Sequence, residues 1–351
     1  MTDLRILILG TGGMAKAHVE AYQAIPGVSV VAGIDTNAER LKAFCDKHKI
    51  PNGFASLDAA LAWGQFDAVS NVTPDPAHHP TTLPLLAAGK HVLCEKPLAS
   101  NYAHAAEMAA AAAKAGVVNM VNLSYRNVPA LIAGAKMVAS GAIGEVRHFE
   151  ASYLQSWLTQ PAWGHWDKES QWLWRLSSAH GSLGVLGDVG VHILDYATFA
   201  AGLFPTNVSC RLATFHKAPD DRIGEYVLDA NDSAVMHLRL ENGAIGTIHT
   251  SRFATGHLND LVLQLFGTKG GIEVRFEGGV SKLRACVGDD RLTGKWADVE
   301  TPAVKTNYVR FVEAIREGRQ EFPDFARGAA LQKVLDLAME SDKANSADLP
   351  V

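Results

Sequence analysis

A lysine stands at the end of a short apolar segment, at a point where a buried strand is expected to end. Lys96 lies between Glu95 and Pro97, after the apolar run His91–Cys94 and before an alanine-rich segment. Burial penalises an ammonium group, so a lysine in this place points to a chemical role. It can donate a hydrogen bond to a substrate oxygen and stabilise negative charge that develops there. A cis peptide bond before Pro97 is one option for this turn.

A second group of reactive side chains opens an expected helix in the second half of the chain. Asp188, His192 and Asp195 are spaced i, i+4 and i+7, which places them on one helical face. An acid and an imidazole directed into a cleft favour acid–base chemistry. One alternative is a capped helix with a structural histidine. Another is a metal site, although a nearby Lys96 would repel a cation.

A glycine-rich turn near the N-terminus has the pattern of a dinucleotide-binding loop. Residues 10–15 read Gly-Thr-Gly-Gly-Met-Ala and match G-x-G-x-x-G/A between an expected strand and an expected helix. Gly10 permits the tight turn, Gly12 lets the backbone approach a pyrophosphate, and Ala15 allows close packing of the helix on the strand. The expected cofactor contacts of this turn are Gly10, Gly12, Gly13 and Met14.

An acid ends the second expected strand, in the position that binds the ribose of a dinucleotide. Asp35 can accept hydrogen bonds from both ribose hydroxyls of NAD, whereas its charge would repel a 2′-phosphate. Arg40, one turn into the next helix, can stack on the adenine or reach a phosphate. NAD is therefore the expected cofactor and NADP the second candidate. The alternative is an ordinary turn followed by a solvated aspartate.

Another loop expected to contact the cofactor follows the third apolar strand. Residues 71–79 read Asn-Val-Thr-Pro-Asp-Pro-Ala-His-His and lie at the carboxyl end of a strand, where ligands of open α/β sheets bind. Thr73, Pro74 and His78 are the expected contacts. His78 and His79 could instead form a surface pair at a helix start, and a metal site would lack a third ligand at suitable spacing.

The elements around these residues alternate between strand and helix in the first third of the chain. This alternation predicts a parallel sheet with helices on both faces, a doubly wound Rossmann fold. The glycines at 89 and 116 end two of the helices. Strands are expected at 4–9, 28–34, 68–72, 91–94 and 117–123, and helices at 10–24, 37–48, 76–88 and 100–115.

The pattern changes after residue 124, where longer alternating segments begin. Such segments favour an antiparallel sheet of hairpins. We therefore predict two α/β domains, a nucleotide-binding domain over 1–124 and a second domain over 125–351. In the second, helices are expected at 131–140, 187–200, 308–317 and 325–343, and strands at 146–155, 208–216, 226–240, 244–253, 261–266 and 271–276.

One segment of the second half holds five of the seven tryptophans, with polar and charged residues among them. Aromatic faces beside hydrogen-bonding groups suit a sugar or polyol, whose CH face stacks while its hydroxyls bond sideways. The segment suits an aromatic loop packed on the sheet or at a subunit contact equally well. Trp163 and Trp166 are the members expected in a substrate wall. The five are Trp157, Trp163, Trp166, Trp172 and Trp174.

Together these motifs resemble the glucose–fructose oxidoreductase/inositol dehydrogenase (Gfo/Idh/MocA) family over nearly the whole chain. The resemblance implies an N-terminal Rossmann domain and a C-terminal α/β domain with an open, mostly antiparallel sheet. In the family that sheet is typically an oligomer interface, so a homodimer or homotetramer is expected. The motifs on which the resemblance rests are, in order along the chain, the glycine turn, Glu95-Lys96-Pro97, Asn122 with Tyr125, Arg126 and Pro129, and Asp188 with Gly190, His192 and Asp195.

The resemblance also implies roles for single residues. The family's catalytic lysine, aspartate and base correspond to Lys96, Asp188 and His192, and the histidine is typical of the inositol dehydrogenase type. His192 is expected to take the hydroxyl proton, Lys96 to bind the same oxygen, and Asp188 to pair with Lys96 or a neighbouring hydroxyl. Further contacts are expected from Glu95 and Asn122 to the cofactor, from Tyr125 and Arg126 to the nicotinamide or substrate, and from Asp195 to the substrate or His192.

The composition is that of a soluble globular protein. The 351 residues are 48% apolar and 20% charged with a net charge of −5, and no basic run suggests a nucleic-acid or membrane partner. The four cysteines are far apart and fit free thiols in a reducing cytoplasm. Residues 1–5 lack a basic region, so we expect no signal peptide, unlike secreted members of the family, and a cytoplasmic location.

The expected function is hydride transfer between nicotinamide and a secondary alcohol of a sugar or cyclitol. A second hypothesis is an NAD-dependent glycosidase, known among the family's relatives, which oxidises its substrate transiently, eliminates and re-reduces it. A third is a nicotinamide-binding sensor without catalysis. Such sensors tend to lose the residues that stand here as Lys96, Asp188 and His192.

Overall fold

The computed structural model describes residues 3–161 and 163–351, which divide into two compact units. The first consists of the chain up to Ser124 together with Lys305–Gln332, and the second of Tyr125–Val304 together with Lys333–Val351. The break after residue 124 coincides with the change of sequence pattern. The segment 305–332 corrects the expected domain bounds, because it belongs to the first unit and not to the second.

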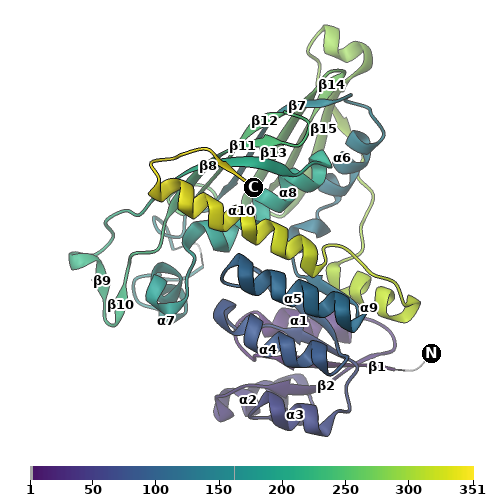
Figure 1. Ribbon diagram of the computed structural model, residues 1–351, viewed down its shortest axis with the longest axis vertical. Coiled ribbons are helices and arrows are strands. Elements are labelled where there is room, and N and C mark those ends of the chain that lie inside the picture. The colour runs from purple at the N-terminus through teal and green to yellow at the C-terminus, as the bar shows by residue number, and fades with distance from the viewer. Residues whose placement is uncertain (1–2, 162) are drawn as a thin grey trace. The chain divides into compact units, whose positions relative to one another are not determined.

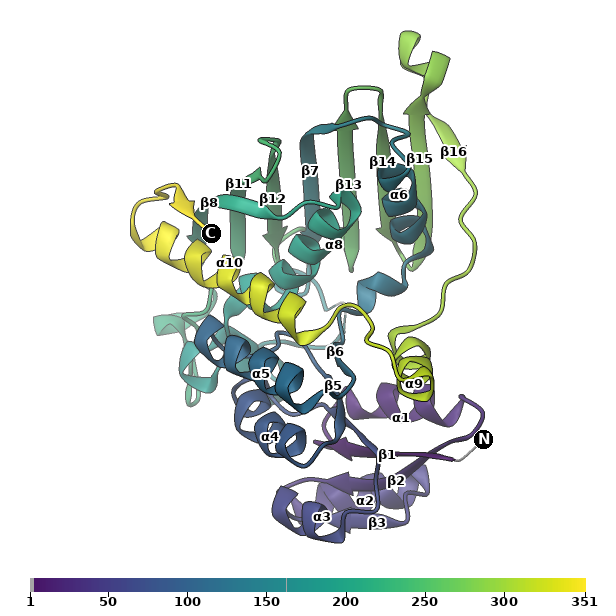
Figure 2. The same cartoon turned by 45° about the vertical axis from the view of Figure 1, so that its right-hand side comes forward.

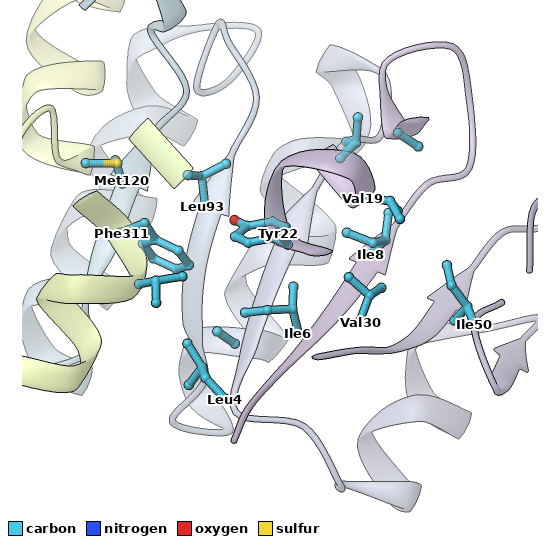
Figure 3. Close-up of a cluster of buried hydrophobic side chains, with 14 of the residues drawn as sticks. Leu4, Ile6, Ile8, Val19, Tyr22, Val30, Ile50, Leu93, Met120 and Phe311 are labelled. Carbon is cyan, nitrogen blue, oxygen red and sulfur yellow. The ribbon is translucent and has the colours of Figure 1, made fainter. Parts of the chain in front are cut away.

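Helix α9 (Asn307–Glu317) explains this correction, because its apolar side is part of the core of the first unit. Phe311 of α9 is fully buried in one cluster with Tyr22 of α1 (Ala15–Gln23) and Ile6 of β1 (Leu4–Leu9), as Figure 3 shows. Burying one such side chain contributes roughly 1.5–3 kcal/mol. The sequence of α9 predicts an amphipathic helix but does not say which sheet receives its apolar side.

The first unit contains a six-stranded parallel sheet in the order β3-β2-β1-β4-β5-β6, the strand order of a Rossmann fold (Figures 1 and 2). The predicted fold is therefore confirmed. Two short elements of this unit, β3 and α3, are not predicted from the sequence. The remaining bounds are β2 (Val28–Ile34), β3 (Asn52–Phe54), β4 (Ala68–Asn71), β5 (His91–Cys94), β6 (Asn119–Val121), α2 (Ala38–His48), α3 (Leu57–Trp63), α4 (Asp75–Ala87) and α5 (Tyr102–Ala115).

The point where the strand order reverses lies between β1 and β4, which are adjacent and parallel. Ligands of open α/β sheets bind outside the carboxyl ends of the strands at such a reversal. The glycine turn follows β1 and the loop with Thr73 follows β4, while Lys96 follows the next strand, β5. The topology thus brings three of the predicted segments to one edge of one sheet.

The second unit is built on a nine-stranded sheet in the order β16-β15-β14-β13-β7-β12-β11-β8-β17 (Figure 2). Its neighbouring strands are antiparallel except β7 and β12, which are parallel. A mixed, mostly antiparallel sheet is what the family resemblance implied. The bounds are β7 (Val146–Leu154), β8 (Pro205–Ala213), β11 (Ser233–Leu240), β12 (Ile245–Ser251), β13 (Asp260–Gly267), β14 (Gly270–Glu277), β15 (Val280–Val287), β16 (Ala297–Val299) and β17 (Leu349–Pro350).

Helices α6 (Pro129–Ala139) and α8 (Val191–Ala201) pack on this sheet, α6 against β14 and β15 and α8 against β7 and β13. Along β11 buried and exposed residues alternate, so one face of the strand is open to solvent in the single chain. The expected strand over 226–240 is two elements, because β10 (Tyr226–Val227) pairs with β9 (Arg222–Ile223) and β11 begins only at Ser233. The last long helix is α10 (Phe325–Lys343).

Candidate active site

The glycine turn leaves room for a phosphate group at the end of β1. Gly10 has a φ of +90°, and a Cβ at this position would lie 2.8 Å from the carbonyl oxygen of Val72. A Cβ at Gly12 or Gly13 would meet nothing within 4 Å, so the backbone borders open space there. Helix α1 begins after Met14 without a side-chain cap, which leaves its first amide groups suited to an anion. The turn therefore fits the pyrophosphate of a dinucleotide.

Asp35, directly after β2, is held by donors from three residues. Thr11 donates its amide and its hydroxyl to Oδ2 at 3.0 and 2.6 Å, and the amide of Asn37 donates to Oδ1 at 2.9 Å. Arg40 donates Nε to Oδ2 at 2.9 Å and Nη2 to Oδ1 at 2.6 Å. Burial opposes ionisation of Asp35, but the hydrogen bonds from Arg40 and Thr11 outweigh it and hold the pKa of this carboxyl well below its usual range.

The loop between β4 and α4 is tied to the strand by one buried amide. Asn71 accepts hydrogen bonds from the amide and the hydroxyl of Thr73 at 3.2 and 2.7 Å and donates to Thr81 and Thr82 of α4. Thr73 and the following Pro74 are thereby fixed beside the glycine turn, since Gly10 lies against the backbone of this loop. Both residues stay in the predicted cofactor-binding set.

The two histidines of α4 do not form the surface pair considered above. His78 is fully buried, and its Nδ1 and Nε2 lie 2.8 and 2.9 Å from the carbonyl oxygens of Pro97 and Thr73. His78 thus bonds the loops around it, and its predicted contact with the cofactor stays a prediction. His79 points to α5, where its ring bonds Glu107 at 2.7 Å and stacks on His104.

The Glu95-Lys96-Pro97 turn follows β5, and the bond before Pro97 is cis. Oε1 of Glu95 lies 2.9 Å from Nε2 of His18 and accepts from Asn122 at 2.6 Å, while Oε2 accepts from the amide of Lys96 at 3.2 Å. Burial opposes ionisation of Glu95, yet the hydrogen bonds from His18 and Asn122 lower its pKa to about 2. The carboxylate thus fixes the backbone that carries Lys96.

Asn122, after β6, joins this turn to α9. Its amide nitrogen donates to Glu95 and to the hydroxyl of Tyr308 at 3.2 Å, and its oxygen accepts from Asn307 at 3.1 Å. Only 2% of Asn122 is exposed. These bonds support the lysine turn, and the predicted contact of Asn122 with the cofactor stays a prediction.

In the second unit, Asp188 lies in η4 (Leu186–Gly190), a π-helical turn directly before α8. Its Oδ2 is 3.1 Å from Nη2 of Arg252 and 3.9 Å from Nε of Arg175. Arg252 is fully buried and its guanidinium lies 5.0 Å from the ring centre of Trp157. Because a π turn winds differently from an α-helix, the i, i+4, i+7 face predicted for this segment is not continuous.

His192 lies in the first turn of α8 among tyrosine rings. The ring centre of Tyr125 is 4.9 Å away in an edge-to-face arrangement, and that of Tyr153 is 6.3 Å away. The two tyrosine hydroxyls are 2.6 Å apart, and Tyr153 also donates to Asn259 at 2.8 Å. Burial raises the pKa of Tyr125 to about 12, so the phenol stays protonated at neutral pH. Of these three rings, the imidazole of His192 is therefore the one suited to accept a proton.

Arg126 and Asp195 bind each other. Nε and Nη2 of Arg126 donate to the two oxygens of Asp195 at 2.7 Å each, and both side chains are buried. The guanidinium also lies 3.8 Å from the ring centre of Phe199. The pair fixes the short helix η1 (Ser124–Asn127), which carries Tyr125, to α8, which carries His192. The contacts predicted for Arg126 with the nicotinamide or substrate, and for Asp195 with the substrate or His192, stay predictions.

The tryptophan segment is mainly an aromatic core. Trp157 is buried in a cluster with Leu173 and Leu228, against which Trp166 and Trp172 pack. Trp174 lies beneath the guanidinium of Arg175. Trp163, by contrast, is 36% exposed and is the better placed of the two predicted wall residues.

Several residues of these networks do not stand out in the sequence as site residues, above all His18, Tyr153 and Arg252. A polar residue on an otherwise buried face is the signal that would have found two of them. His18 shares the buried side of α1 with Ala15 and Val19, and Arg252 continues the alternating buried positions of β12 (Ile245–Ser251).

Within the described residues, no group of three or more His, Cys, Asp or Glu side chains is arranged to hold a metal ion. No helix in the described part of the chain is long and apolar enough to cross a membrane.

Comparison with known proteins decides the family. A model described as an oxidoreductase family with an NAD-binding Rossmann fold matches residues 4–123, and a model of the GFO/IDH/MocA C-terminal domain matches residues 133–273. The chain belongs to the Gfo/Idh/MocA family. The resemblance predicted from the motifs is confirmed, and the protein is an oxidoreductase with an NAD-binding Rossmann domain.

Curated relatives of this Gfo/Idh/MocA protein include sugar-converting enzymes. A levoglucosan dehydrogenase of Pseudarthrobacter phenanthrenivorans is 27% identical and covers 100% of this chain and 99% of its own length. A 1,5-anhydro-D-fructose reductase of Ensifer adhaerens is 31% identical, over 76% of this chain and 74% of the relative. Among solved structures, levoglucosan dehydrogenase in complex with NADH and levoglucosan has a TM-score of 0.87 and 26% identity, covering 99% of each chain.

Proposed function

We propose that this enzyme oxidises a secondary hydroxyl of a cyclic sugar, anhydro-sugar or cyclitol with NAD, and catalyses the reverse reduction. The observation that carries the proposal is the full-length similarity to a dehydrogenase solved with NADH and an anhydro-sugar. The geometry supports it in each unit separately. The first unit has a turn that fits a dinucleotide, and the second has a buried imidazole between two protonated tyrosines.

His192 is the proposed general base and takes the proton of the reacting hydroxyl. Tyr125 and Tyr153 hold the imidazole by ring contacts. Arg252 and Arg175 hold Asp188, which orients the substrate hydroxyls rather than acting as a base. Lys96 donates a hydrogen bond to the same reacting oxygen and stabilises its negative charge. When bound, nicotinamide supplies the acceptor for the hydride.

The remaining residues of the site have supporting roles in this proposal. Trp163 stacks on the substrate ring from the surface of its loop, since more than a third of its side chain is exposed. Trp166 supports that loop from the aromatic cluster. Arg126 and Asp195 keep Tyr125 in place beside His192.

The second unit is also the proposed site at which copies of the chain assemble. The proposed location of the protein is the cytoplasm. One face of its sheet is exposed along β11, with Val235 and, on β12, Ile245 more than 40% exposed. An open apolar sheet face favours pairing with a second copy into a homodimer or homotetramer. The four cysteines, all buried free thiols, suit a reducing compartment.

A substrate panel tests the proposed reaction. Purified protein is incubated with levoglucosan, other anhydro-sugars, aldoses and inositols, each with NAD and with NADP, and nicotinamide absorbance is followed. We expect turnover with at least one cyclic polyol and NAD. Release of sugar from a glycoside without accumulation of NADH would favour the glycosidase hypothesis. Tight cofactor binding without turnover on any member would favour the sensor.

Variants of the two proposed catalytic groups test the roles. Lys96→Ala and His192→Asn are each expected to lower kcat by about 100-fold or more, because general base and oxyanion contacts each contribute that much. NAD binding by His192→Asn stays near the wild-type value. Lys114→Ala, an exposed lysine of α5, is the matched control. Turnover of Lys96→Ala within a few-fold of wild type would contradict the assignment.

A further inference from the structure

The residues on either side of Lys96 each contact a fully buried histidine. Oε1 of Glu95 lies 2.9 Å from Nε2 of His18, and the carbonyl oxygen of Pro97 lies 2.8 Å from Nδ1 of His78. Neither histidine has any exposed surface. They come from different helices, α1 and α4, so the lysine turn is held at both ends by separate elements of the sheet's helical cover.

Both ring nitrogens of His18 are bonded to buried groups. The carboxylate of Glu95 can only accept, so Nε2 of His18 carries a hydrogen. On the other side, the hydroxyl of Ser70 lies 2.7 Å from Nδ1 and can donate or accept there. The two contacts hold the ring, and with it the carboxylate of Glu95, in one place.

The partners of His78 require a charged ring. Both of its nitrogens face backbone carbonyl oxygens, that of Pro97 at 2.8 Å and that of Thr73 at 2.9 Å. A carbonyl oxygen cannot donate, so a neutral imidazole would leave one nitrogen lone pair directed at an oxygen lone pair. An imidazolium donates to both. Burial disfavours the charge, but Cys94, Asp75 and the carbonyl of Pro97 face the ring and raise the pKa of His78 to about 10.

We propose that His18 and His78 are positioning residues for Lys96, with His18 fixing Glu95 and an imidazolium at His78 fixing Pro97. His78 has a second task, because its other hydrogen bond holds Thr73 in the loop expected to contact the cofactor. The cofactor loop and the lysine turn are thus joined through one charged ring. This inference rests on the proposed role of Lys96 in catalysis.

The protonation state is tested on the wild-type protein by nitrogen NMR of labelled histidine, with His78→Gln and His18→Gln used to assign the signals. We expect His78 to carry hydrogens on both ring nitrogens at about pH 7.5. A His78 signal with one bare nitrogen at that pH would overturn the charged clamp. This measurement needs no activity, so its result is independent of the proposed reaction.

Kinetics separate positioning from general destabilisation. His18→Gln is expected to lower kcat about tenfold or more while the Kd of NAD changes less than about twofold, since misplacing a reacting group affects turnover first. His78→Gln is expected to lower kcat similarly and to weaken NAD about fivefold, because it also releases Thr73. His104→Gln on the exposed side of α5 is the control with unchanged values. Ser70→Ala removes the hydroxyl that bonds Nδ1 of His18. It is measured instead if a histidine variant does not fold.

A double-mutant cycle shows whether the histidines act through the lysine. In a Lys96→Ala background, His18→Gln and His78→Gln should lower the remaining turnover less than about twofold, because the group that they position is gone. An undiminished effect in that background would overturn the proposal, as would single variants with kcat within twofold of wild type. If Lys96→Ala alone retains turnover, the proposed function of Lys96 fails, whatever the protonation state of His78.

Discussion

Two carboxylates of the Rossmann unit are both held as anions, but their partners differ in kind. Asp35 is bonded by Arg40, whose side chain is 52% exposed, and by donors of the neighbouring backbone. Glu95 is bonded by His18 and Asn122, both buried. The two acids follow strands of the same sheet, β2 and β5.

The difference indicates how each acid is used. An exposed guanidinium can leave its carboxylate at little cost, because water replaces the lost contacts. Arg40 can therefore turn to a ligand while Asp35 keeps its other donors. A buried carboxylate that loses a partner is left with an uncompensated charge. Glu95 is thus suited to hold the lysine turn in one geometry, and Asp35 to meet a cofactor that comes and goes.

The largest expected effect is the pH dependence of stability that Glu95 confers. Its pKa falls from an ordinary 4.5 to about 2 on folding. The stabilisation is therefore fully present above about pH 4.5 and is lost as the pH falls through about 2. A shift of this size corresponds to about 3 kcal/mol. Compared with Glu95→Gln, the wild type should be more stable by up to that amount at neutral pH, and the difference should shrink on acidification.

Urea unfolding followed by circular dichroism at a series of pH values measures this difference. Glu107→Gln is the matched control, because that carboxylate is 60% exposed and pairs with His79 at the surface. Its free energy of unfolding should track the wild type at every pH. A Glu95→Gln difference that stays constant down to about pH 3 would show that burial, and not ionisation, governs this site.

The comparison also explains how far the sequence predicts the molecule. Asp35 and the glycine turn follow from local pattern, because strand, turn, helix and acid are close in sequence and their order specifies the Rossmann crevice. Glu95 and Lys96 are found in the same way. His18 and Tyr308, which complete the network around Glu95, are 77 and 213 residues away from it along the chain. Only the folded sheet brings them together, so no local pattern predicts the contact.

In the second unit the sequence predicts the residues and misses their partners. Asp188 and Asp195 are selected because they accompany His192, yet each binds an arginine from another element, Arg252 and Arg126 respectively. The single π turn at 186–190 breaks the helical spacing on which the predicted face depends. Arginine contacts of this kind depend on strand register and helix docking, which are fixed by packing across the whole sheet.

The selectivity between NAD and NADP tests the contrast between Asp35, with its exposed partner, and Glu95, with its buried partners. If the guanidinium of Arg40 turns to a 2′-phosphate, Arg40→Ala should raise the Kd of NADP about tenfold, the typical effect of losing one charge-assisted hydrogen bond. The Kd of NAD should change less than about threefold, since Asp35 keeps Thr11 and Asn37. Isothermal titration with both cofactors measures the ratio. Lys42→Ala removes a cation from the same helix, one that bonds Asp46, and serves as control. Equal weakening of both cofactors would refute a role in selectivity.

The smallest expected effect is that of Arg40→Ala on stability, and its comparison with Asn122→Ala tests the same contrast directly. Arg40→Ala should lower the free energy of unfolding by less than about 1 kcal/mol, because the side chain is half exposed and its pairing is screened by water. Asn122→Ala should lower it by about 2–3 kcal/mol, because a buried donor to an ionised carboxylate is lost. Urea unfolding of both variants at neutral pH compares them. Equal losses would mean that exposure does not separate the two acids, and that Arg40 is as rigidly held as the network around Glu95.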